Sequence, residues 1–137
     1  MIIGRLLSRL GIRPGRRSRA LPAAAPSGDL LADIGDLPAL TANGTPAIVE
    51  VRTGVLVVVN RRGEVFAVDA RCPHLGAPLT NAIVKRSTIT CPSHWCRFDL
   101  RTGVSLPRPS SRLRCPPLRT FAVRVVGDRV LVHDEPA

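Results

Sequence analysis

Short runs of β-branched and other apolar residues, separated by turn residues, fill the chain between Asp29 and Ala137. Such runs are typical of strands, because branched side chains pack well on a pleated surface. The tripeptides 61–63 and 126–128 each separate two runs, as hairpin turns do. The runs cover residues 47–52, 55–60, 65–68, 83–85, 87–90, 121–125 and 129–133. The pattern predicts an all-β fold in which two long loops interrupt the strands.

Length and composition narrow the class of protein further. The 137 residues suit one domain, and the 45% hydrophobic content is enough to form a core. Thirteen Pro and eleven Gly argue against a helical bundle. The longest apolar run is far below the roughly 18 residues that a membrane-spanning helix needs. These features exclude a wholly disordered chain and a transmembrane protein.

The positive charge is unevenly placed along the chain. The net charge is +10, and residues 1–28 hold six Arg and no acidic residue, which leaves +4 for residues 29–137. Nucleic-acid binding proteins are often this basic, but aromatic residues for base stacking make up only 3% of this chain. We therefore expect no nucleic-acid partner. We divide the chain into a basic, flexible leader (1–28) and a folded domain (29–137).

The leader allows several interpretations. Apolar residues at helical spacing and arginines four apart would suit a short amphipathic helix on an anionic membrane or an acidic partner. A frayed tail is favoured, because so short a helix is marginal in water. Arg16 and Arg17 form a twin-arginine pair, but two prolines interrupt the segment after it, which disfavours export. Residues 23–28 resemble a linker.

Two loops carry the candidate chemistry. One is Cys72-Pro-His-Leu-Gly-Ala-Pro-Leu79 and the other is Cys91-Pro-Ser-His-Trp-Cys-Arg-Phe98. Each loop begins with Cys-Pro and supplies a histidine shortly afterwards, His74 in the first and His94 in the second. The proline fixes φ and stiffens the loop behind the cysteine. Two matched loops with one thiol and one imidazole each indicate a metal site.

The distribution of the four ligands distinguishes the candidate metals. Zinc also accepts two Cys and two His, but a zinc finger takes its cysteines from one element and its histidines from another. Here each loop supplies one of each, which suits two metals that both loops reach. A [2Fe–2S] cluster with two Cys on one iron and two His on the other is such a centre. The sequence favours the cluster and leaves a zinc-stabilised binding module as the alternative.

The two loops resemble the cluster-binding loops of Rieske-type ferredoxins. Residues 98–103 continue the match, residues 116–125 resemble the segment that returns into the sheet, and the likeness covers about residues 29–134. It implies stacked antiparallel sheets with the two loops at one tip. It also implies one [2Fe–2S] cluster, with Cys72 and Cys91 on the inner iron and His74 and His94 on the outer iron.

The chain departs from the high-potential branch of that family. Ala77 and Ser93 stand where that branch has a cysteine pair linking the loops, so that disulfide cannot form here. Cys96 and Phe98 replace its hydroxyl donors to the cluster sulfurs. Fewer donors stabilise the reduced cluster less, so we expect a reduction potential near the low end of the Rieske range, about −150 mV.

Other residues near the loops invite weaker interpretations. Trp95 stands where the family usually has a glycine, so it must either take an ordinary conformation or be strained. Cys96 is expected to be a stray thiol and Cys115 a small buried hydrophobe or a chance surface residue. His133 is expected to be solvated. Arg71 and Arg97, which flank the ligands, either hold the reduced cluster or an acidic partner, or are simply solvated.

These features predict an electron carrier with no catalytic residues of its own. The chain shows no Gly-rich dinucleotide loop and no nucleophile with a base. The resemblance implies a ferredoxin that takes single electrons from a flavin reductase and passes them to a terminal oxygenase. The alternative is a small subunit that assembles with the large subunit of an assimilatory nitrite reductase. Free thiols at Cys96 and Cys115 would suit a reducing cytoplasm, which is the expected location.

Overall fold

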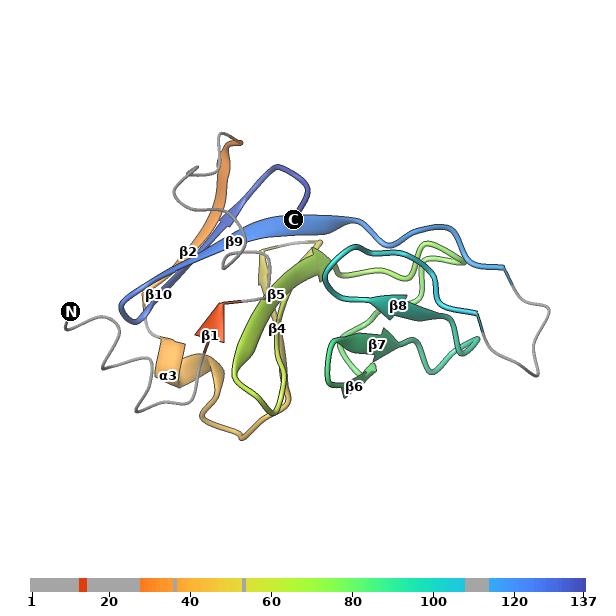
Figure 1. Ribbon diagram of the computed structural model, residues 1–137, viewed down its shortest axis with the longest axis horizontal. Coiled ribbons are helices and arrows are strands. Elements are labelled where there is room, and N and C mark those ends of the chain that lie inside the picture. The colour runs from red at the N-terminus through yellow and green to blue at the C-terminus, as the bar shows by residue number, and fades with distance from the viewer. Residues whose placement is uncertain (1–12, 15–27, 36, 53, 108–113) are drawn as a thin grey trace.

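In the part of the chain that it describes, the computed structural model is a β-protein with one short helix (Figure 1). It describes residues 13–14, 28–35, 37–52, 54–107 and 114–137. The elements are β1 (Arg13–Pro14), β2 (Leu30–Ile34), α3 (Leu37–Leu40), β3 (Ala47–Arg52), β4 (Val55–Val59), β5 (Glu64–Asp69), β6 (Ile83–Lys85), β7 (Thr88–Thr90), β8 (Arg97–Asp99), β9 (Thr120–Val126) and β10 (Arg129–His133). The predicted all-β class is confirmed, and each predicted run contains a strand within one or two residues of its expected bounds.

Three elements of the domain were not predicted. Strand β2 is mixed in polarity, β8 is only three residues long, and α3 spans a single turn. The segment considered as a possible amphipathic helix lies outside the described residues, except for Arg13–Pro14, which form β1, and the Arg16–Arg17 pair also lies outside them. Among the described residues, no helix is long and apolar enough to cross a membrane.

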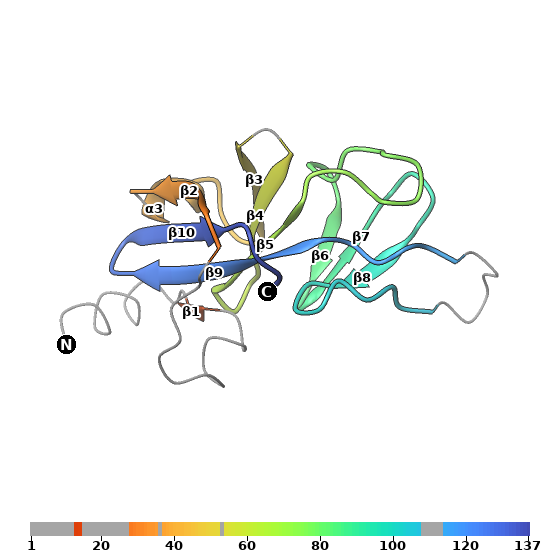
Figure 2. The same ribbon diagram turned by 90° about the horizontal axis from the view of Figure 1, so that it is seen from above.

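The strands form three antiparallel groups. One sheet has the order β2-β10-β9-β5-β4-β3, and the short β1 adds in parallel to β5. Strand β9 joins two groups within this sheet, because Phe121 and Thr120 pair with β5 while residues 122–126 pair with β10. The third group is the separate sheet β6-β7-β8. The expected stack of antiparallel sheets is therefore present, with β9 connecting two of its layers (Figure 2).

Strands β4 and β5 form the middle of the stack. All five residues of β4 are buried, and alternate residues enter two different cores. Val55, Val57 and Val59 pack with β9, β10 and α3, whereas Leu56 and Val58 pack toward β6–β8. Burial on both faces explains why this strand is a continuous apolar run rather than an alternating one.

The prediction for His133 was wrong. The residue is half-buried, and its Nδ1 lies 3.1 Å from the Gly28 carbonyl oxygen. Gly28 also donates its backbone N–H to Glu135 Oε2 at 2.9 Å. The reason is that the unpredicted β2 pairs with β10 and places Leu30 opposite His133, so the last strand is covered by the start of the domain.

Both candidate loops lie at one end of the molecule (Figure 1). The first leaves the C-terminal end of β5 and the second connects β7 to β8. A disulfide brings residues 114–117, which precede β9, against the second loop. We call residues 71–79, 91–97 and 114–117 together the tip. It lies away from the β9–β10 hairpin turn (Figure 1).

Candidate metal centre

The first loop is closed by two backbone hydrogen bonds. Cys72 donates its N–H to the Ala77 carbonyl at 2.7 Å, and Gly76 donates its N–H to the Cys72 carbonyl at 2.8 Å. Gly76 has φ 74°, a left-handed conformation that glycine adopts without a steric penalty. Arg71 reinforces the turn, because its Nη1 donates to the Gly76 carbonyl at 3.1 Å. The resulting compact loop fixes the direction of the Cys72 side chain.

The second loop repeats the same pair of bonds. Cys91 donates its N–H to the Cys96 carbonyl at 2.8 Å, and Trp95 donates its N–H to the Cys91 carbonyl at 2.8 Å. Trp95 thus occupies the position of Gly76, and its φ is 63°. Left-handed backbone costs a side-chain-bearing residue roughly 1–2 kcal/mol. Of the two outcomes expected for Trp95, the structure shows the strained one.

The two loop cysteines meet in the core. The Cys72 and Cys91 side chains are free thiols, 2% and 0% exposed, and are close enough to hydrogen-bond to each other. Burial raises the pKa of the Cys72 thiol. The backbone N–H groups of His74 and Leu75 donate toward its sulfur and lower the pKa, while the Cys91 sulfur raises it. Such a buried sulfur pair suits a metal, since coordination keeps thiols deprotonated where burial alone would not.

The two loop histidines also form a pair. Their ring centroids are 4.9 Å apart, and the ring planes meet at 76°. His94 is exposed, whereas His74 is half-buried, and its Nδ1 is buried without a hydrogen-bond partner. A buried ring nitrogen with no partner is unfavourable unless it binds something that the protein alone does not provide. A metal bound through this nitrogen would remove that penalty.

The four side chains therefore form two pairs, one of thiols and one of imidazoles. The sulfurs form an inner, buried pair and the imidazoles an outer pair, although each loop contributes one of each. Among the described residues, no group of three or more His, Cys, Asp or Glu side chains is placed to hold one ion. Two pairs are what a cluster with Cys on one iron and His on the other requires. The residues thus fit a [2Fe–2S] group.

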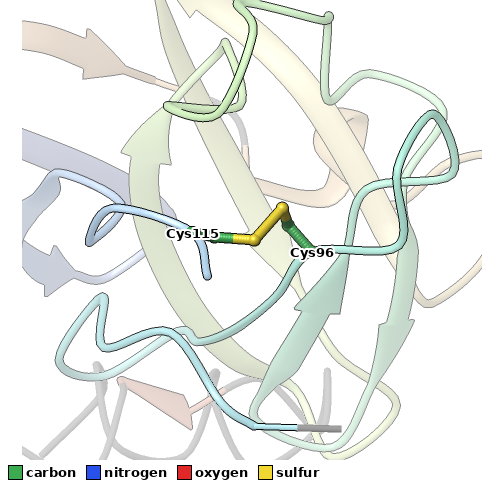
Figure 3. The surroundings of a disulfide bond; sticks show 2 residues. All are labelled: Cys96 and Cys115. Carbon is green, nitrogen blue, oxygen red and sulfur yellow. A yellow bond between two sulfur atoms is a disulfide. The ribbon is translucent and has the colours of Figure 1, made fainter. Parts of the chain in front are cut away.

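The predictions for the other two cysteines were wrong. Cys96 and Cys115 are joined by a disulfide with Cα atoms 6.1 Å apart (Figure 3). The bond forms because the segment before β9 returns past the second loop, a contact between positions 19 residues apart. Counting the cysteines could have suggested it, since two of the four are left over once the loop pair is set aside. The argument for a reducing cytoplasm from free thiols at these positions no longer holds.

The other loop residues considered in the sequence differ in burial. Phe98 is fully buried and has no hydroxyl with which to reach a cluster sulfur. Ala77 is half-buried and Ser93 is exposed. Arg71 and Arg97 are both exposed at the tip. The backbone N–H groups of His74 and Leu75 donate toward the Cys72 sulfur, which also lies within hydrogen-bonding reach of the Cys91 thiol.

Comparisons with known proteins agree with this geometry. Residues 31–132 match the family model of the Rieske [2Fe–2S] domain. The ferredoxin component of biphenyl 2,3-dioxygenase from Rhodococcus jostii is 38% identical over 80 residues, which is 58% of this chain and 71% of the relative.

Two solved structures are similar in fold. The ferredoxin of carbazole 1,9a-dioxygenase from Nocardioides aromaticivorans superposes with a TM-score of 0.60 at 29% identity, covering 78% of this chain and 99% of that one. A ferredoxin chain from a complex of reduced oxygenase and oxidized ferredoxin in carbazole 1,9a-dioxygenase superposes with a TM-score of 0.56 at 25% identity, covering 72% and 91%. The chain belongs to the Rieske [2Fe–2S] domain family and carries one Rieske-type cluster.

Proposed function

We propose that this protein carries single electrons from a reductase to a terminal oxygenase, with Cys72, Cys91, His74 and His94 as the cluster ligands. The observation that carries the proposal is the separation of a buried thiol pair from an outer imidazole pair. Relatives that are ferredoxin components of dioxygenase systems, and a solved complex between such a ferredoxin and its oxygenase, support the assignment of partners.

Each ligand residue has a distinct task in this proposal. The bound cluster supplies the chemistry, which is the uptake and release of one electron. Cys72 and Cys91 sit in the core that excludes water, and the loop N–H groups on the Cys72 sulfur favour its charged form. His94 is exposed and gives the electron a short route to a partner. The protein thereby insulates one side of the centre and opens the other.

Spectroscopy of the anaerobically purified protein tests the proposal. We expect red-brown protein with two irons per chain and, after dithionite reduction, the low average g-value of a Rieske centre. The reduction midpoint is expected near the low end of the Rieske range, about −150 mV. His94→Ala should remove this spectrum, while Ser93→Ala, its exposed neighbour, should keep it. Colourless protein with one bound zinc would contradict the assignment.

The partners require a separate experiment. Reduction by a flavin reductase, followed by electron delivery to a dioxygenase oxygenase component, would support the proposed position between two proteins. Stable co-purification with a large sirohaem protein would instead support the nitrite reductase subunit. The cytoplasmic location also stays a prediction, and cell fractionation would test it.

A further inference from the structure

The acidic and basic residues of the domain are segregated along the chain. Residues 70–127 contain ten basic residues and one acidic residue, a net charge of +9. Residues 29–69 and 128–137 contain four basic and nine acidic residues, a net charge of −5. The basic segment supplies both cysteine loops and the β6–β8 sheet, whereas the acidic segments form β2 to β5 and β10. The charge therefore differs between the part that holds the loops and the rest of the domain.

Three exposed arginines lie at the tip itself. Arg71 precedes Cys72, and its bond to the Gly76 carbonyl places the guanidinium beside the first loop. Arg97 and Arg114 each adjoin one half of the disulfide, which holds their two segments together. The three stretches of the tip contain no Asp or Glu.

These arginines are not neutralised by carboxylates in the described part of the chain. The ion pairs found there are Arg119 with Asp134 and Arg129 with Asp33. Both pairs lie outside the tip and involve acidic residues of the acidic segments. Arg71, Arg97 and Arg114 take part in neither. Their charge is thus available to an approaching molecule.

The arginines accompany an exposed apolar surface. Leu75 is 67% exposed and Trp95 is 50% exposed, and each adjoins a candidate ligand histidine in the sequence. His94 is exposed as well, and its ring centroid lies 4.9 Å from that of His74. Exposed apolar residues together with charged ones are the usual anatomy of a protein–protein contact, and here the charged side chains of the tip are all positive.

We propose that the tip docks a redox partner whose contact surface is rich in Asp and Glu around an apolar centre. This inference rests on the proposed function, because it assigns the chemistry of the partner that meets the exposed histidine. The excess positive charge of the segment that carries the loops orients the protein as it approaches such a partner, so that the loops arrive first. Complementary charge of this kind mainly accelerates association.

Electron transfer to one acceptor in two charge forms tests the proposal. The acceptors are oxidised cytochrome c, which is rich in lysine, and the same protein with its lysines succinylated, which is acidic. Stopped-flow rates of cytochrome reduction by the reduced protein are measured between about 20 and about 300 mM NaCl, a range over which screening changes strongly. The rate with the succinylated form should fall about tenfold as salt rises. The rate with the native form should rise or stay constant.

Charge-reversal variants locate the effect on the tip. Arg97→Glu and Arg114→Glu should each slow the low-salt reaction with succinylated cytochrome c about threefold, and together about tenfold. Arg61→Glu is the matched control. Arg61 is also exposed, but it lies in the β4–β5 turn, at the opposite end of β5 from the first loop, and its reversal should change the rate less than twofold.

The outcomes separate this inference from the proposed function. Absence of the Rieske spectrum in the unmodified protein would refute the proposed function. A normal spectrum with the same salt dependence for both cytochromes, or with Arg61→Glu as damaging as the tip variants, would overturn the docking proposal alone. So would salt-independent rates accompanied by tip-dependent sedimentation with phosphatidylglycerol vesicles, since the arginines would then serve a lipid surface.

Discussion

The two cysteine loops share one backbone design but are held in place differently. In each loop the cysteine N–H and C=O are bonded to the fifth and fourth residues that follow it. The first loop has Gly76 at the left-handed position and a hydrogen bond from Arg71. The second has Trp95 at that position and a disulfide to a distant segment. The first loop is thus held by local, unstrained contacts and the second by a covalent tether.

This difference shows how a strained residue can persist. Trp95 raises the free energy of the second loop, and the neighbouring Cys96 is fixed to Cys115, which limits the alternatives that the loop can adopt. The histidines also differ, because His74 is the second residue after its cysteine and His94 is the third. On equivalent backbones, this offset leaves one imidazole half-buried and the other exposed. The second loop is therefore the one suited to meeting a partner.

Loss of the cysteine ligand from either loop should have the same effect on the cluster. Cys72→Ser and Cys91→Ser should each abolish the visible absorption of the cluster completely, since both loops supply one sulfur to the same iron in the proposed ligand set. The measurement is the spectrum and iron content after anaerobic purification. Ser93→Ala serves as the control. Retention of the full spectrum in either serine variant would disprove the ligand assignment.

Removal of the tether should destabilise the second loop. The double variant Cys96→Ala, Cys115→Ala should lower the free energy of unfolding by about 3 kcal/mol, as expected for opening a closed loop of this length. Denaturant titration of the purified protein measures the effect. Addition of dithiothreitol should remove most of the difference between the unmodified protein and the variant. If both unfold at the same denaturant concentration without reductant, the tether contributes nothing.

Substitutions at the left-handed position of the two loops should change the free energy of unfolding in opposite directions. Gly76→Ala should destabilise the protein by roughly 1–2 kcal/mol, because it introduces a side chain at φ 74°. Trp95→Gly should relieve a similar strain and raise the unfolding free energy by up to about 1 kcal/mol, since the flexibility of glycine offsets part of the gain. Thermal unfolding compares the two variants. Destabilisation by Trp95→Gly would show that the indole's contacts outweigh its backbone strain.

Loss of the hydrogen bond from Arg71 to the Gly76 carbonyl should have the smallest effect on stability. Arg71→Gln removes a hydrogen bond from an exposed guanidinium to the Gly76 carbonyl, which contributes less than about 1 kcal/mol. Hydrogen exchange of the first-loop amides should increase slightly, while second-loop amides stay unchanged. Equal increases in both loops would indicate that the two loops open together.

The sequence was informative where the signal is local. Strands β3 to β7, β9 and β10 follow from runs of β-branched residues and the turns between them. Strand β2 was missed because its residues alternate only weakly, and it forms by pairing with β10 about 100 positions later. His133 was misjudged for the same reason. The pairing of Cys96 with Cys115 likewise depends on how the chain returns past the second loop, which spacing alone does not reveal.

By itself, the sequence determined the all-β class, the two matched loops and the four side chains proposed as ligands, because periodicity, turn residues and ligand spacing act over a few neighbouring positions. Only the tertiary structure brought the sulfurs into one buried pair and the imidazoles into an outer pair. It also joined Cys96 to Cys115 and held Trp95 in a left-handed conformation. These features depend on contacts between segments far apart in the chain, whose free energies are decided by the packing of the whole domain.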